Sequence, residues 1–135
     1  MPQVFVDTAA WIALLNTSDA LRAPAQAVLA QLRAQSTRLI TSEFVLLELA
    51  NALSAPALRR STIAFIESLP TLDEVEIIAL DTNLLAAGWE LYRARPDKEW
   101  GLTDCVSFVI MRQAEITVAF TSDHHFEQAG FTKLL

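Results

Sequence analysis

Short β-branched runs alternate with helical segments along this 135-residue chain, and the alternation constrains the fold more than any other feature. Strands are predicted at residues 4–6, 38–41, 75–80, 117–120 and 131–135. Helices are predicted at 8–15, 24–35, 42–53, 57–69 and 84–95, and from about 103 to 112. Such alternation is typical of a parallel sheet with helices on both faces. We therefore expect an α/β architecture with about five parallel strands, formed by residues 1–135 as one domain.

One carboxylate, Asp104, lies at the start of a helix that is apolar nearly all round. Val106, Phe108 and Met111 are among the apolar residues that follow it, and Thr103 is the expected N-cap. An aspartate in the first turn interacts favourably with the helix dipole, by roughly 0.3 to 1 kcal/mol. This segment alone therefore leaves both a capping role and a functional role open for Asp104.

The composition limits the class of protein. The net charge is −6, whereas a protein that binds the nucleic-acid backbone normally has a basic surface, although an acidic chain suits a metal site. No apolar run is long enough for a membrane span, and the first residues lack the pattern of a signal peptide, so we expect a cytoplasmic protein without a membrane partner. The single cysteine, Cys105, is expected to be a buried thiol.

Four acidic residues fall near one predicted edge of the sheet. Asp7 follows the first strand directly and Asp123 follows the fourth; Glu48 lies in the helix after the second strand, and Asp104 opens the helix before the fourth. In parallel sheets, ligands bind beyond the carboxyl ends of the strands. Glu48 has apolar neighbours in sequence, where a carboxylate is costly unless it is hydrogen-bonded, neutralised or bound to a cation, so we favour it over Glu43, which suits a helix start.

Clustered carboxylates repel one another, and a divalent cation removes that repulsion. Ligands that are all oxygen suit Mg²⁺ or Mn²⁺, which commonly join a few carboxylates to a substrate phosphate. The chemistry that follows from such a site is phosphodiester hydrolysis, with the metal orienting and acidifying a water molecule.

Four segments carry a resemblance to a known family. VFVDTAAWIALL, TSEFVLLELANAL, GLTDCVSFVIM and AFTSDHHFEQAGF, in this order and spacing, resemble the acidic motifs of PIN-domain nucleases. The last segment is especially similar to the VapC-type toxin ribonucleases of prokaryotic toxin–antitoxin pairs. The resemblance implies a three-layer α/β/α domain, Mg²⁺- or Mn²⁺-dependent endoribonuclease activity on RNA, a homodimer, and a small antitoxin that occludes the site.

The resemblance also implies roles for individual residues. Asp7, Glu48, Asp104 and Asp123 match the catalytic, metal-binding acids, with Asp7 and Asp104 as the principal ligands. Glu48 is expected to activate water or to bind the metal through one, and Asp123 to act in a second metal site or outside the ligand set. The supporting residues are Thr8, Ser107 and Thr121. Arg112 is a further supporting candidate because it lies two helical turns after Asp104, on roughly the same face, where it either reaches a phosphate or pairs with an acid of the site.

Other polar and aromatic residues have simpler interpretations beside the functional ones. His124 and His125 are interpreted as loop or phosphate contacts in preference to metal ligands. Arg93, Arg95 and Lys98 either are solvated charges or line the RNA-binding side of the site. Trp100 either packs on the core, which we favour, or stacks on a base.

Three alternative functions stay open at this point. One is an RNA-processing nuclease without an antitoxin. Another is a flavodoxin-like receiver module that uses its acids as a phosphoacceptor and cation pocket, although the acids are spread over four elements and no lysine ends the last long strand. The third is a non-catalytic module whose acidic edge binds a basic peptide.

Overall fold

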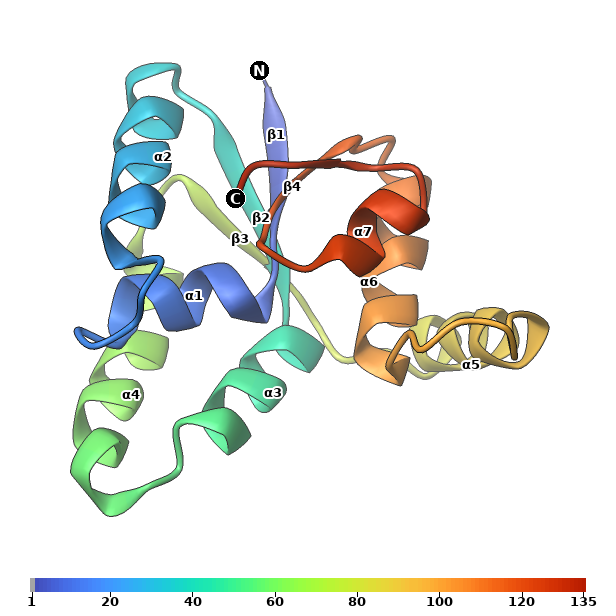
Figure 1. Cartoon of the computed structure of the whole chain (residues 1–135), viewed down its shortest axis with the longest axis horizontal. Coiled ribbons are helices and arrows are strands. Elements are labelled where there is room, and N and C mark those ends of the chain that lie inside the picture. Colours follow the sequence, from blue (N-terminus) through green and yellow to red (C-terminus); the bar gives the residue numbers. More distant parts are fainter. Residues whose placement is uncertain (1) are drawn as a thin grey trace.

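The computed structural model describes residues 2–135 and contains five parallel strands in one sheet (Figure 1). They are β1 (Gln3–Val6), β2 (Arg38–Ser42), β3 (Val75–Ile78), β4 (Val118–Phe120) and β5 (Thr132–Lys133). Their order across the sheet is β3-β2-β1-β4-β5, and every neighbouring pair is parallel. The predicted five-stranded parallel sheet is confirmed. Its order differs from the 2-1-3-4-5 order of flavodoxin-like domains, which removes the basis of the receiver alternative.

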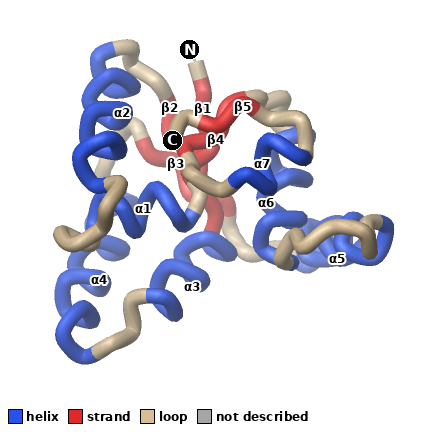
Figure 2. The backbone as a smooth tube through the Cα atoms, viewed as in Figure 1, coloured by secondary structure: helices blue, strands red, loops and turns tan. Residues whose placement is uncertain are grey.

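Helices cover the sheet on two sides, as Figures 1 and 2 show. The helices are α1 (Thr8–Leu15), α2 (Arg22–Ala34), α3 (Glu43–Ala52), α4 (Pro56–Ser68), α5 (Thr82–Ala94), α6 (Leu102–Gln113) and α7 (His124–Gln128), with a 3-10 turn at Leu69–Thr71. The α1, α2 and α4 helices lie on one side of the strands, and α5, α6 and α7 on the other. The three-layer expectation is therefore confirmed. None of the helices in residues 2–135 combines the length and apolar character needed to span a bilayer.

Apolar side chains from both layers form one core around β1 and α6. Phe5 and Phe120 are fully buried on neighbouring strands, and Phe108 of α6 makes edge contacts with Trp100 and with Phe126 of α7. Each such side chain stabilises the fold by roughly 1.5 to 3 kcal/mol through burial. The α6 helix is thereby held rigidly, and the residues in its first turn have a fixed position.

Close packing of α5 against α6 depends on a glycine. Gly88 of α5 lies so near α6 that a Cβ atom there would collide with the Val106 side chain. The two helices can approach this closely only because glycine has no side chain. Gly88 therefore helps to set the position of α6, which carries Asp104.

Two local predictions need correction. The α6 helix begins at Leu102 with Gly101 as its N-cap, so the expected N-cap at Thr103 is wrong. The backbone N–H of Gly101 donates to Asp104 Oδ2, because a carboxylate at the third helical position can reach back to the N-cap. The segment after β4, expected to be a loop, forms the short helix α7, whose N-cap Asp123 accepts from the backbone N–H of His125.

Candidate active site

The central strands bring the first and fourth acidic segments together. β1 and β4 are neighbours, and the backbone N–H of Asp7 donates to the carbonyl of Phe120 at 3.2 Å. The chain turns from β1 into α1 at Asp7, which is the N-cap, and from β4 into α7 at Asp123. Both aspartates therefore lie at the carboxyl edge of the sheet, where the strand order reverses.

Three aspartates form a compact cluster at this edge. Asp7, Asp104 and Asp123 each offer a carboxylate oxygen within 4.8 Å of the other two. The first turn of α6 supplies Asp104, and the two strand ends supply the others. The expected meeting of these three acids is thus observed in the geometry.

Asp7 is the most deeply buried member of the cluster. Its exposed fraction is 3%, and its Oδ2 accepts a 3.0 Å hydrogen bond from the Thr121 hydroxyl. Its Oδ1 is also buried and has no hydrogen-bond partner in residues 2–135. A buried carboxylate oxygen without a partner is costly unless it is protonated or bound to a cation.

The pKa values of two of these carboxyl groups are raised. Burial raises the pKa of Asp7 from 3.8 to about 7, and the charges of Asp104 and Glu48 add to the effect. Burial also raises the pKa of Asp104, with repulsion by Asp123 as the next cause, although a hydrogen bond to His125 opposes the shift. The cluster disfavours its own negative charge, which a bound cation would compensate.

Thr121 links two of the aspartates. Its hydroxyl donates to Asp7 Oδ2 and accepts from the backbone N–H of Asp123 at 3.0 Å. The side chain is fully buried, so both contacts are shielded from water. Thr121 therefore lies at the cluster, and its predicted supporting role stays a prediction.

Glu48 joins the site through Thr8. The Thr8 hydroxyl donates to Glu48 Oε1 at 2.6 Å, so both residues lie beside the cluster, although Glu48 is not part of the group of three. The inference that Glu48 has an apolar surrounding is wrong, since its side chain is exposed. Val45 and Leu49 of α3 point into the core, whereas Leu47 and Glu48 project outward because they occupy the opposite helix face.

His125 lies at the cluster, and sequence reasoning underrated it. Its Nδ1 is 3.2 Å from Asp104 Oδ2 and 3.3 Å from Asp123 Oδ1. The signal that could have found it is its position in the first turn after a capping aspartate. His124, by contrast, is largely exposed.

Two supporting candidates lie outside the cluster. Ser107 is fully buried in α6, and its hydroxyl has no hydrogen-bond partner in the described chain. Arg112 is exposed near the end of α6, about 12 Å along the helix axis from Asp104. No ion pair joins Arg112 to a site acid in residues 2–135.

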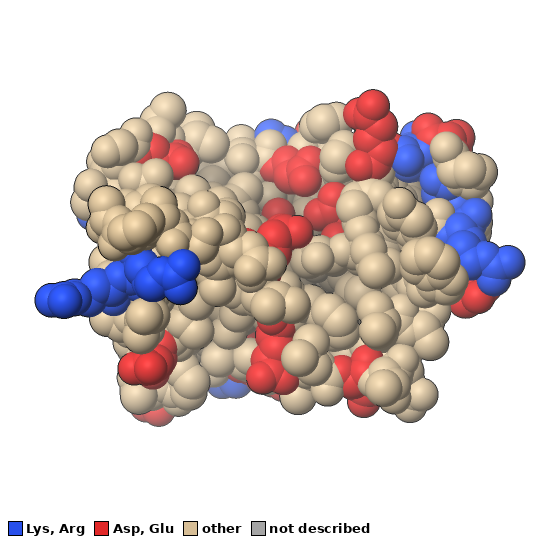
Figure 3. Space-filling view, turned by 90° about the horizontal axis from the view of Figure 1, so that it is seen from below, with Lys and Arg blue, Asp and Glu red and all other residues tan. Residues whose placement is uncertain are grey.

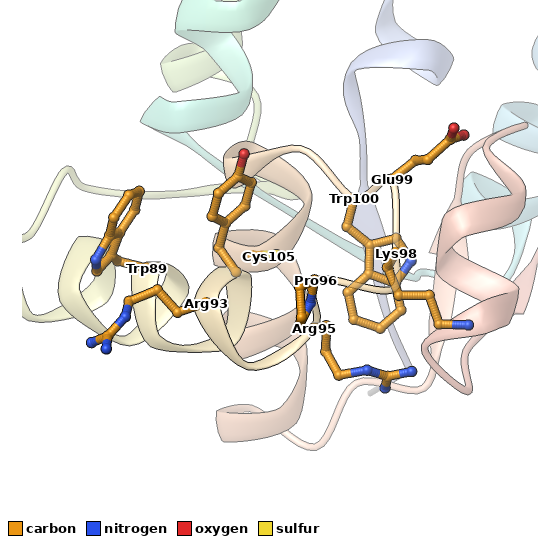
Figure 4. A pocket seen from close by; sticks show the side chains of 9 residues that line it. Trp89, Arg93, Arg95, Pro96, Lys98, Glu99, Trp100 and Cys105 are labelled. Carbon is orange, nitrogen blue, oxygen red and sulfur yellow. The ribbon is translucent and has the colours of Figure 1, made fainter.

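Aromatic and basic residues that mostly precede Asp104 in the chain line a pocket (Figure 4). It is bounded by Trp89, Tyr92 and Arg93 of α5, by Arg95, Pro96, Lys98, Glu99 and Trp100 of the following loop, and by Cys105. The favoured packing role of Trp100 is confirmed: the ring is buried and its Nε1 donates to Gln128. Arg95 holds Asp97 in an ion pair that lowers the pKa of Asp97 to about 2.

The charged side chains are unevenly distributed on the face seen in Figure 3. Acidic side chains gather along its middle, and basic ones lie toward its two ends. A polyanion would therefore meet repulsion at the centre of this face unless cations were bound there.

The residues of the cluster fit a divalent cation. Three carboxylates from three elements converge, and the partnerless Oδ1 of Asp7 supplies a ligand atom that nothing else in the described chain satisfies. Oxygen donors of this kind suit Mg²⁺ or Mn²⁺.

Comparisons with known proteins agree with this geometry. Residues 4–132 match the family model of the PIN domain. The chain is 31% identical over 132 residues, 97% of each protein, to the 23S rRNA-specific endonuclease VapC20 of Mycobacterium tuberculosis. The crystal structure of VapC20, described as a Sarcin-Ricin loop cleaving toxin, superposes with a TM-score of 0.83, 28% identity and 96% coverage of each chain.

Two further solved structures share the fold. VapBC2 from Rickettsia felis, bound to a DNA fragment from its promoter, has a TM-score of 0.71 at 16% identity and covers 97% of this chain and 96% of its own. DNA-bound VapBC from Salmonella typhimurium has a TM-score of 0.69 at 15% identity and covers 98% and 97%. At these identities the likeness concerns the fold alone.

Proposed function

The chain belongs to the PIN-domain family, and from that premise we propose that it is a metal-dependent endoribonuclease, the toxin of a toxin–antitoxin pair. The observation that carries the proposal is the cluster of Asp7, Asp104 and Asp123 with the unpartnered Oδ1 of Asp7. A relative at 31% identity is a 23S rRNA-specific endonuclease, so ribosomal RNA is the substrate to test first.

Asp7, Asp104 and Asp123 would hold the cation, Mg²⁺ or Mn²⁺. When bound, such an ion acidifies and orients water and offsets the charge that develops on the phosphate. Thr121 keeps Asp7 and Asp123 in place through its two hydrogen bonds. Burial of Asp7 excludes water from one side of the site, which strengthens its electrostatic interactions.

Glu48 is the proposed general base. It is exposed to solvent, and Thr8 fixes one of its oxygens, so the other is free to take a proton from water. The deprotonated water forms a new bond to phosphorus, the bond from phosphorus to one ribose oxygen breaks, and that oxygen leaves as a hydroxyl after taking a proton from solvent. The charge of Glu48 also adds to the raised pKa of Asp7, which places the two groups within electrostatic range.

The loop that borders this pocket, with Arg95 and Lys98, is the proposed RNA contact (Figure 4). Arg93 and Arg95 are each paired with a nearby acid, whereas Lys98 makes no ion pair in residues 2–135 and is available for a phosphate. The same loop leads directly into Gly101, whose N–H holds Asp104. Phosphates bound here would run toward the cluster.

A homodimer is proposed to form through α5. Leu85, Trp89 and Tyr92 are exposed and follow the i, i+4, i+7 spacing of one helix face, and the rings of Trp89 and Tyr92 stack at 5.5 Å. Trp89→Glu should yield a monomer in light scattering after gel filtration. Ile63→Glu on α4, equally exposed, is the matched control and should leave the mass unchanged; an unchanged mass for Trp89→Glu would contradict this interface.

A small antitoxin is the proposed protein partner. The acidic middle of the face in Figure 3 would attract a basic segment of such a partner, which would then block the cluster. The similar structure at 28% identity is described as a toxin, which supports a partner that blocks its activity. Co-expression with a candidate antitoxin, such as the product of any small reading frame found beside the gene, should give a complex that does not cleave RNA; full cleavage by that complex would contradict the pairing.

Cleavage of purified ribosomal RNA and of a mixed RNA pool tests the proposed activity. The wild type and Asp73→Asn, an exposed aspartate far from the cluster in sequence, should cut with Mg²⁺ or Mn²⁺ and not with EDTA. Asp104→Asn, shown to be folded by circular dichroism, should not cut. Cleavage that persists in EDTA or in Asp104→Asn would overturn the proposal.

A further inference from the structure

His125 occupies a position between two carboxylates of the cluster. Its Nδ1 lies 3.2 Å from Asp104 Oδ2 and 3.3 Å from Asp123 Oδ1, and its side chain is 17% exposed. The backbone N–H of His125 also donates to Asp123 Oδ1 at 2.9 Å, which fixes the start of α7. The imidazole is therefore held in place by the same residue that it contacts.

The 3.2 Å contact is a hydrogen bond in this structure, and both distances also match those between neighbouring ligands of one ion. In an octahedral site with bonds of about 2.1 Å, adjacent ligand atoms lie about 3.0 Å apart. The Nδ1 of His125 stands at nearly that spacing from one oxygen of each carboxylate. Independently, Asp7 completes the cluster with a buried Oδ1 that has no hydrogen-bond partner in the described residues.

We propose that His125 is a direct ligand of the cation, together with Asp104 and Asp123, so that the site combines nitrogen and oxygen donors and prefers Mn²⁺ to Mg²⁺. Imidazole suits first-row transition ions, whereas Mg²⁺ selects oxygen donors and retains water. This inference rests on the proposed function only in requiring that a cation binds the cluster. It assigns the metal preference to a residue outside the four acids.

His124 provides a matched comparison within the same helix. Its Nδ1 is 3.8 Å from Asp123 Oδ1, its side chain is 68% exposed, and no contact joins it to Asp104 among the described residues. The ring centroids of the two histidines are 4.5 Å apart, so both belong to the same local surface. The ligand atoms of Asp123, His124 and His125 lie within 4.8 Å of one another, but His124 is exposed and has no contact with Asp104 among the described residues, so its loss should weaken Mn²⁺ binding far less than the loss of His125.

The experiment measures binding of Mn²⁺ and Mg²⁺ by calorimetry, and of Mn²⁺ by pulsed electron paramagnetic resonance. The wild type and His124→Gln should show hyperfine coupling of bound Mn²⁺ to a ligated nitrogen. His125→Gln should lose that coupling and bind Mn²⁺ about 10- to 100-fold more weakly, since even residues that only support ligands contribute that much to affinity. Its Mg²⁺ affinity should change much less.

The outcomes separate this inference from the proposed function. Mn²⁺ binding that is lost in Asp104→Asn, without nitrogen coupling in the wild type, overturns the role of His125 alone. Equal losses of Mn²⁺ and Mg²⁺ affinity in His125→Gln overturn the selectivity. Absence of cation binding by the wild type overturns both this inference and the metal dependence of the proposed enzyme.

Discussion

Replacing Asp7 with asparagine should stabilise the metal-free protein at alkaline pH. Asparagine keeps the size of the side chain and an oxygen that accepts from Thr121, but it carries no charge. In the wild type that charge is buried beside Asp104, and Oδ1 has no hydrogen-bond partner within residues 2–135. The variant therefore removes an unfavourable group from the fold and, by the same change, a proposed ligand of the cation.

The free-energy cost of burying the charge of Asp7 follows from the pKa of this group, which is raised from 3.8 to about 7. A raised acid pKa means that the folded state prefers the protonated form, so the cost is absent below pH 3.8 and is complete above pH 7. At about 1.36 kcal/mol per pH unit, the full cost is on the order of 4 kcal/mol. Between pH 5 and pH 8 the advantage of Asp7→Asn should grow by roughly 2 to 3 kcal/mol.

Denaturant unfolding in EDTA at pH 5 and pH 8 measures this difference. Asp7→Asn should be more stable than the wild type at both values, and clearly more so at pH 8. Asp73→Asn, which replaces an exposed aspartate, should show little change at either pH. An advantage that does not grow with pH, or a variant less stable than the wild type at pH 8, would refute the reasoning about the buried charge.

Adding the cation should reduce the difference in stability between Asp7→Asn and the wild type. An ion that binds only the folded wild type stabilises it by about 2.7 kcal/mol at 100 times its Kd. Asp7→Asn lacks that ligand and should gain little. Equal stabilisation of both proteins by Mn²⁺ would mean that Asp7 does not hold the ion.

Three further predictions concern affinity, catalysis and packing. The affinity for the cation should fall about tenfold for each pH unit below 7, since Asp7 must lose its proton on binding. Calorimetry at pH 6 and pH 8 measures this fall, and an affinity that does not change with pH would contradict it. Glu48→Gln should lower kcat by about 10²- to 10⁴-fold with Mn²⁺ affinity retained, and an unchanged kcat would exclude it as the base. Gly88→Ala should cost about 1 to 3 kcal/mol in denaturant unfolding because its Cβ meets Val106, and an unchanged stability would show that α5 shifts freely.

Much of the fold could be predicted because the sequence pattern is local. Residues 4–6 and 38–41 are apolar or β-branched and precede helical segments, which identifies parallel strands. The strand order could not be predicted, because all five strands end at the same edge and no local signal says which ones are neighbours. The order matters to the site, since it places Asp7 beside Asp123.

The candidate site was predictable in part. Asp7, Asp104 and Asp123 could be found because each lies at a strand end or a helix start. The apolar surrounding inferred for Glu48 was wrong because neighbours in sequence lie on different faces of a helix. His125 was underrated because its position depends on the capping of α7 by Asp123, a contact that a five-residue helix barely signals in sequence.

The central claim is that water, activated at a cation held by these carboxylates, cuts the RNA. The chemical structure of the new RNA ends tests this claim most directly. Attack by water leaves a linear phosphate on one product and a hydroxyl on the other, whereas attack by the ribose 2′-hydroxyl leaves a 2′,3′-cyclic phosphate. Mass spectrometry of the products should show linear ends that form only with Mg²⁺ or Mn²⁺. Cyclic phosphate ends that form in EDTA would contradict the proposed mechanism.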